Sequence, residues 1–278
     1  MSSELIDIGE ISEHVSDVKG FHLPSFFGHL PDLPAIDIMG YHFQITKFMV
    51  LEVAVAIFMI VLFVSLACKM RGGKLVKGRF WNLLECFLVY LRDEVINPCI
   101  GKNNAGPYLP YLWTLFFFIL FCNLAGMLPW CGSPTGALGV TVGLAVVTYL
   151  VVICGGMAKQ GIVTYWLHQV PKLDLPLAIG IFLKPMIFVI EVVGLLIKHV
   201  VLAVRLLANM FAGHVVLAVF LVFIAATANN FVLWVGVTFS CVMMSVALSC
   251  LELFVAFLQA YIFTFLAALF IGMSLHQH

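Results

Sequence analysis

Several polar side chains lie within one long apolar run near the C-terminal end of the chain. Glu191, Lys198 and Arg205 are spaced by seven residues, and Asn209 follows Arg205 by four. On an α-helix a step of seven drifts by only about 20°, so these residues share one face. An ionisable side chain at mid-bilayer costs between ~2.5 and ~17 kcal/mol, and such residues therefore face a protein interior or a water path. The spacing predicts a functional face on a membrane helix.

Arg205 gives the strongest indication of function. Its guanidinium cannot lose its proton in a protein, so burial in a membrane requires a counter-charge. No acidic residue lies within one helical turn, and Glu191 and Glu252 are the only acids in this apolar half of the chain. We expect another subunit to bring the opposing carboxylate.

A second set of polar residues lies away from the face that carries Arg205. His214 follows Arg205 by nine residues, which places it on the opposite side of the helix at 100° per residue. Glu252 and Gln259 are seven residues apart and share a face of the next helix. Because an imidazole titrates near physiological pH, His214 and Glu252 are candidates for a proton path. His199, beside Lys198, is expected to be a satisfied or interfacial residue.

The elements that must carry these residues are membrane helices. With 63% hydrophobic and 10% charged residues and a mean hydropathy of +1.12, the composition is typical of a polytopic membrane protein. We predict an all-α fold with four to five membrane helices plus one amphipathic helix. Ordinary spans are expected at about 46–68, 108–128 and 137–157, and the amphipathic helix at about 80–97, ended by Pro98.

The last two helices are predicted to be unusually long, at about 184–227 and 230–274. Each would extend ~65 Å at 1.5 Å per residue, about twice the hydrocarbon thickness of a bilayer. We therefore expect a hairpin of two strongly tilted helices. The alternative is that each breaks into two ordinary spans.

Residues 1–45 are mixed and polar, and we expect a solvated arm outside the membrane followed by one membrane domain, 46–278. No basic segment precedes an apolar one there, so no cleavable signal peptide is expected. The basic segment 69–79 belongs on the inner side by the positive-inside rule. These features favour a bacterial inner membrane, with the mitochondrial inner membrane as the alternative.

The composition also argues against nucleic-acid binding and against a metal or cofactor site. A net charge of +0 gives no basic field for nucleic acid. The eight cysteines form no Cys-x-x-Cys, so we interpret them as small buried apolar residues and expect no metal and no cofactor.

Asn123, inside the second span, either makes a helix–helix hydrogen bond or is part of an ion path. A secondary transporter binding an anionic solute at Arg205 and Lys198 would need broken helices and repeats, which the sequence does not show.

Three segments resemble a known family: RLLANMFAGH beginning at Arg205, LEL around Glu252, and LQAYIF around Gln259. They are similar to subunit a of the F-type ATP synthase, with Glu191 and Asn209 also in the family's register. The resemblance implies a stator beside a ring of c subunits, not catalytic alone, with subunit b, other ATP synthase subunits and the lipid bilayer as partners.

The same resemblance implies roles for the site residues. Arg205 would face the essential carboxylate of the ring, with Asn209 and Gln259 as polar neighbours. His214 and Glu252 would belong to an aqueous half-channel. Glu191 is a further candidate for the proton path, and a structural or headgroup role, shared with Lys198, is the alternative.

Overall fold

The computed structural model describes residues 35–38, 41–44, 46–70, 78–128, 134–168 and 177–275. Helices make up nearly all of these ranges. The exception is a short antiparallel hairpin of strands β1 (Ala35–Ile38) and β2 (Tyr41–Gln44), in which Ala35 is paired with Gln44. Residues 1–34 of the expected arm lie outside the described residues.

Five of the described helices are long and apolar enough to cross a membrane, which confirms the prediction of a polytopic all-α protein. A short helix, α7 (Ile162–His168), follows α6. The η3 turn (Gly106–Tyr108) leads into α5, and the η4 turn (Pro134–Gly136) precedes α6. The five spanning helices are α2 (Lys47–Met70), α5 (Leu109–Gly126), α6 (Leu138–Gln160), α8 (Leu177–Ala226) and α9 (Phe231–Leu275).

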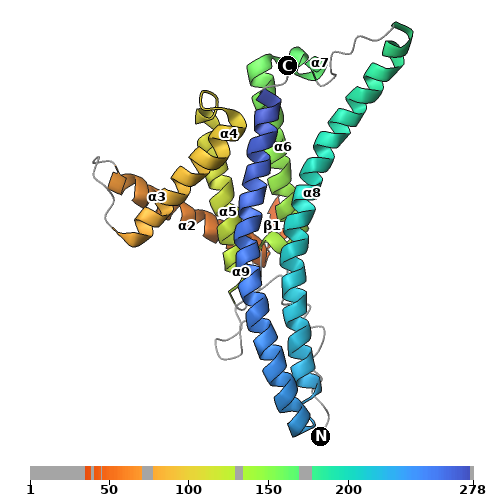
Figure 1. Ribbon diagram of the computed structural model, residues 1–278. Coiled ribbons are helices and arrows are strands. Elements are labelled where there is room, and N and C mark those ends of the chain that lie inside the picture. Colours follow the sequence, from red (N-terminus) through yellow and green to blue (C-terminus); the bar gives the residue numbers. More distant parts are fainter. Residues whose placement is uncertain are drawn as a thin grey trace. The chain divides into compact units, whose positions relative to one another are not determined.

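Helices α8 and α9 are continuous, so the alternative of two ordinary spans in each is wrong (Figure 1). Their 50 and 45 residues correspond to about 75 Å and 68 Å at 1.5 Å per residue. The start expected at residue 184 is also wrong, because α8 begins at Leu177 and includes Pro185. Proline is tolerated inside membrane helices, where neighbouring groups satisfy the freed backbone. The steep tilt stays a prediction.

The amphipathic helix is built from three consecutive parts, α3 (Arg79–Tyr90), the π-helical η2 (Leu91–Ile96) and α4 (Asn97–Ile100). Contrary to expectation, Pro98 does not end it. The first turn of a helix needs no N–H from its proline, and Pro98 stands in the first turn of α4. The helix ends at Gly101, whose φ of 87° suits glycine.

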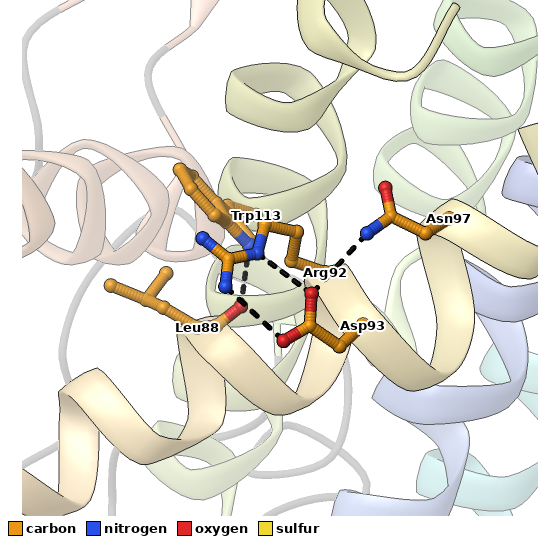
Figure 2. A network of polar contacts seen from close by, with 5 residues as sticks. All are labelled: Leu88, Arg92, Asp93, Asn97 and Trp113. Atoms are coloured by element: carbon orange, nitrogen blue, oxygen red, sulfur yellow. Dashed lines mark hydrogen bonds and ion pairs between the residues drawn. The ribbon is translucent and has the colours of Figure 1, made fainter. Parts of the chain in front are cut away.

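Polar contacts fix this helix to α5 and line its outer side (Figure 2). Trp113 Nε1 of α5 donates to the Leu88 carbonyl at 3.1 Å. On the exposed side, Arg92 donates to Asp93 at 2.9 Å, and Asn97 donates to the same carboxylate at 3.2 Å. The hydrogen bond from Arg92 holds the pKa of Asp93 below its ordinary value.

The chain forms two compact units, each assembled from three segments. The first comprises Met1–Val64, Phe117–Val140 and Leu206–Ala260, and the second comprises Ser65–Phe116, Thr141–Arg205 and Tyr261–His278. In the second unit, α6 and the end of α9 are joined by two hydrogen bonds, from Ser274 Oγ to the Val152 carbonyl and from Gln160 Nε2 to the Ser274 carbonyl, both 3.0 Å.

The described cysteines are mostly on helix surfaces. Cys122 is the only buried one among them, so the expectation of buried cysteines is wrong for the others. An apolar helix surface that a bilayer covers satisfies a cysteine as well as a protein core does. Within the described ranges no group of histidine, cysteine or acidic side chains has the arrangement of a metal site.

Candidate functional site

The carboxyl group of Glu252 lies directly against helix α8. The side chain is 6% exposed, and its Oε1 and Cδ occupy the space that a Cβ on Gly213 would need, with Cδ only 2.9 Å from that position. The missing side chain of Gly213 therefore makes room for the carboxyl. His214 is the next residue of α8. Glu252 therefore meets α8 within one residue of the histidine with which the sequence analysis grouped it.

Glu252 has a buried oxygen that still needs a partner. Its Oε1 makes no hydrogen bond to any described residue. An unsatisfied buried polar group costs ~1–3 kcal/mol, and more when charged. His214 belongs to α8, but its side chain is outside the described part of the structure, so the pairing of Glu252 with His214 stays a prediction.

Gln259 extends the polar side of α9 two turns beyond Glu252. It is 3% exposed, and its Nε2 is buried with no hydrogen-bond partner in the described ranges. Between these two side chains lies Ala256, which is fully buried, as is Ala260. The small side chains allow close packing of this stretch.

A hydrogen-bonded clamp holds α9 one turn beyond Glu252. Asn123 of α5 is fully buried, and its Nδ2 donates to the Ala256 carbonyl at 3.2 Å. Its Oδ1 accepts a hydrogen bond of 2.7 Å from Thr135 Oγ1. Of the two interpretations of Asn123, the structure supports the helix–helix hydrogen bond. Since Ala256 and Glu252 are one turn apart, the clamp fixes the angular position at which Glu252 meets Gly213.

The other face of the site belongs to α8 alone. Arg205 and Lys198 are exposed, whereas Glu191 and Asn209 are half-exposed. Arg205 makes no ion pair or hydrogen bond with a residue that the structure describes. A neighbouring side of α8, about 60° to 140° around the helix from Arg205, is buried, with Leu202, Leu206 and Met210 each at most 1% exposed. Arg205 therefore lies on an exposed side of its helix, next to the packed side.

Two residues of this site were missed from the sequence. Gly213 was visible in the motif, but only the register of α8 against α9 shows that it faces a carboxyl group. Thr135 lies in η4, just before α6, and gave no signal, since its role depends on its tertiary contact with Asn123.

The chain is similar in sequence to a known family of membrane proteins and to several of its named members. The family described as ATP synthase A chain matches residues 48–272. A protein named ATP synthase subunit a from Myxococcus xanthus is 35% identical over 268 residues, which are 95% of this chain and 85% of that protein. ATP synthase subunit a 2 from Chlorobaculum tepidum is 34% identical over 267 residues, 95% of this chain and 72% of that protein. A relative from Anaeromyxobacter dehalogenans, also named ATP synthase subunit a, is 41% identical over 211 residues, 75% of this chain and 52% of that protein.

Proposed function

The chain belongs to the ATP synthase A chain family, and on that basis we propose that it is the membrane stator that carries protons to and from a rotating ring of c subunits. The observation that carries the proposal is Arg205. It is a permanent cation on a membrane helix, exposed, and without an ionic partner among the described residues. A carboxylate on an adjoining ring supplies the missing charge.

Arg205 separates two proton paths. An opposite charge within a few ångströms favours the ionised form of a carboxyl group, so a ring carboxyl arriving at Arg205 releases its proton. The fixed positive charge also repels a proton that would pass directly from one path to the other. Asn209, one turn further along α8, is a polar neighbour on the same side.

The half-channel beyond Arg205 uses Glu252 and His214. A carboxyl and an imidazole can each take up and release a proton, and the close approach of Glu252 to Gly213 supports a short transfer between them. Gln259 lies on the ring-facing side of α9, and Glu191 serves the path at the opposite end of α8. Neither role requires a metal or an organic cofactor.

The partners follow from this assignment. The ring of c subunits faces Arg205, subunit b and the other ATP synthase subunits complete the stator, and the nucleotide chemistry lies in other chains. The relatives named above come from bacteria, which favours the bacterial inner membrane. The five apolar helices are the part of the chain in contact with lipid.

ATP-driven acidification of inverted membrane vesicles tests the proposal. The wild-type complex is expected to acidify the vesicle interior, and Glu252→Gln, which keeps the shape but removes the titratable group, is expected to abolish acidification while the complex still assembles. Full acidification by this variant would exclude Glu252 from the path. The rival transporter of anionic solutes predicts solute uptake by the wild type in the absence of ATP.

A further inference from the structure

His199 is a buried imidazole to which neither the site nor the family resemblance gives a role. The sequence predicts a satisfied or interfacial residue, and in the structure the side chain is buried, at 2% exposure. Its ring lies between Tyr149 of α6, at a centroid distance of 5.3 Å, and Phe270 of α9, at 5.1 Å. These residues and the first part of α8 all belong to the second compact unit.

The depth of His199 in the helix bundle is informative. Tyr149 is eleven residues from each end of α6, which runs from Leu138 to Gln160. The imidazole edge that meets Tyr149 is therefore close to the middle of a membrane-spanning helix. Ionisable residues at this depth are expensive and mark ion or proton pathways by default.

The hydrogen bonding of the ring leaves one nitrogen free. Nδ1 is 2.9 Å from the Leu195 carbonyl, which can only accept, so Nδ1 carries a hydrogen. In the neutral ring Nε2 then has a lone pair. This Nε2 is buried and has no hydrogen-bond partner in the described part of the chain. Buried polar atoms are almost always satisfied by protein or by water, which points to a water molecule as its donor.

Resting on the proposed function, we propose that His199 is a further proton-relay residue, on the path that serves the half of α8 preceding Arg205. A hydronium ion on one side gives a proton to the Nε2 lone pair and becomes water, and the imidazolium later gives that proton to a second water, which becomes hydronium and leaves the ring neutral. Because Nδ1 stays bonded to Leu195, the proton enters and leaves through the same nitrogen, and no other bond forms or breaks.

The other groups around the ring are consistent with this role. Lys198 is the only charged group in contact with this cluster among the described residues, and its ammonium lies 5.9 Å from the centre of the Phe270 ring. Tyr149 contributes a titratable group from α6, and α9 contributes the apolar ring of Phe270. No described acid competes with water for Nε2.

Water access is tested first, in the assembled complex with the eight native cysteines replaced by alanine. A cysteine is introduced by His199→Cys, and in a matched control by Leu202→Cys, a 1% exposed position on the same buried side of α8. A small water-borne thiol reagent is expected to modify position 199 at least about tenfold faster than position 202. Equal rates would overturn the proposal.

Proton transfer is tested with His199→Phe, which keeps an aromatic ring between Tyr149 and Phe270. A general acid–base group contributes typically about 10²–10⁴-fold, and with water as a partial bypass we expect acidification to fall about tenfold or more. The pH profile should also lose one titration, which a purely structural role would not change. If this variant does not assemble, His199→Gln gives the same comparison.

The outcomes separate the two proposals. If wild-type vesicles acidify and the His199 variants match them in rate and pH profile, His199 has no relay role, and the proposed function of the chain stands. If the wild-type complex itself moves no protons, the proposed function fails.

Discussion

Substituting alanine for Gly213 tests the contact between α8 and Glu252. The new Cβ would overlap the Glu252 Oε1 and lie 2.9 Å from its Cδ, whereas ordinary contact begins at 3.4 Å. The carboxyl must therefore move by roughly 0.5 Å or more, which a flexible side chain can do without unfolding the helix. Helix propensity itself favours alanine by about 1 kcal/mol.

The expected effect is on proton transfer and not on assembly. A displacement approaching 1 Å at a reacting group can reduce a rate by about 10²-fold, so we expect Gly213→Ala to lower ATP-driven acidification by roughly 10- to 100-fold. The amount of the chain in the membrane should stay at the wild-type level. A shorter acid, Glu252→Asp, should restore part of the rate in the double variant, because its carboxyl is withdrawn from the new methyl group.

Gly194→Ala is the matched control for this experiment. Gly194 belongs to the same helix, and a Cβ there would meet no described atom within 4 Å. The control gains the same helix propensity and should pump at the wild-type rate. Wild-type acidification by Gly213→Ala, in a complex that assembles normally, would refute the reasoning, because the Glu252 carboxyl would then not need its place against α8.

Three further predictions concern the supports of the site. Asn123→Ala removes two buried hydrogen bonds, one to the Ala256 carbonyl and one from Thr135, so the assembled complex should lose about 2–4 kcal/mol of stability in thermal or detergent denaturation, against about 1 kcal/mol for Thr135→Val. Gly272→Ala places a methyl group on the Cys99 carbonyl, which is backbone and cannot rotate away, so less of the chain should accumulate in the membrane. Asp93→Asn should leave pumping at neutral pH within about twofold, because an exposed ion pair is weak. Because its pKa is lowered, Asp93 stays ionised and keeps its ion pair with Arg92 until the pH falls below the ordinary value of 3.8. The wild type should therefore show no titration of this group near neutrality.

Periodicity and length were enough to predict the long helices and the outward face of α8. Arg205 and Lys198 share a side because seven residues are nearly two full turns, and this holds whatever packs against the helix. The continuity of α8 and α9 was likewise expected, because neither contains a polar turn in its middle. The early start of α8 was missed, and Pro185 lies inside the helix, as proline can in a membrane.

Contacts between helices were not predictable in the same way. Gly213 meets Glu252 because of the register between two antiparallel helices, which no local pattern specifies. His199 was assigned with its neighbour Lys198, although adjacent residues on a helix are 100° apart and face different surroundings. Thr135 donates to Asn123 from η4, twelve residues further along the chain. Each of these depends on tertiary packing.

The central claim is that Arg205 is the fixed charge between two proton paths. The most direct measurement is ATP-driven acidification of inverted vesicles that contain the assembled complex with Arg205→Ala. We expect acidification to be abolished while the subunits remain assembled and ATP is still hydrolysed. Acidification at the wild-type rate would contradict the account and leave Arg205 with a structural role.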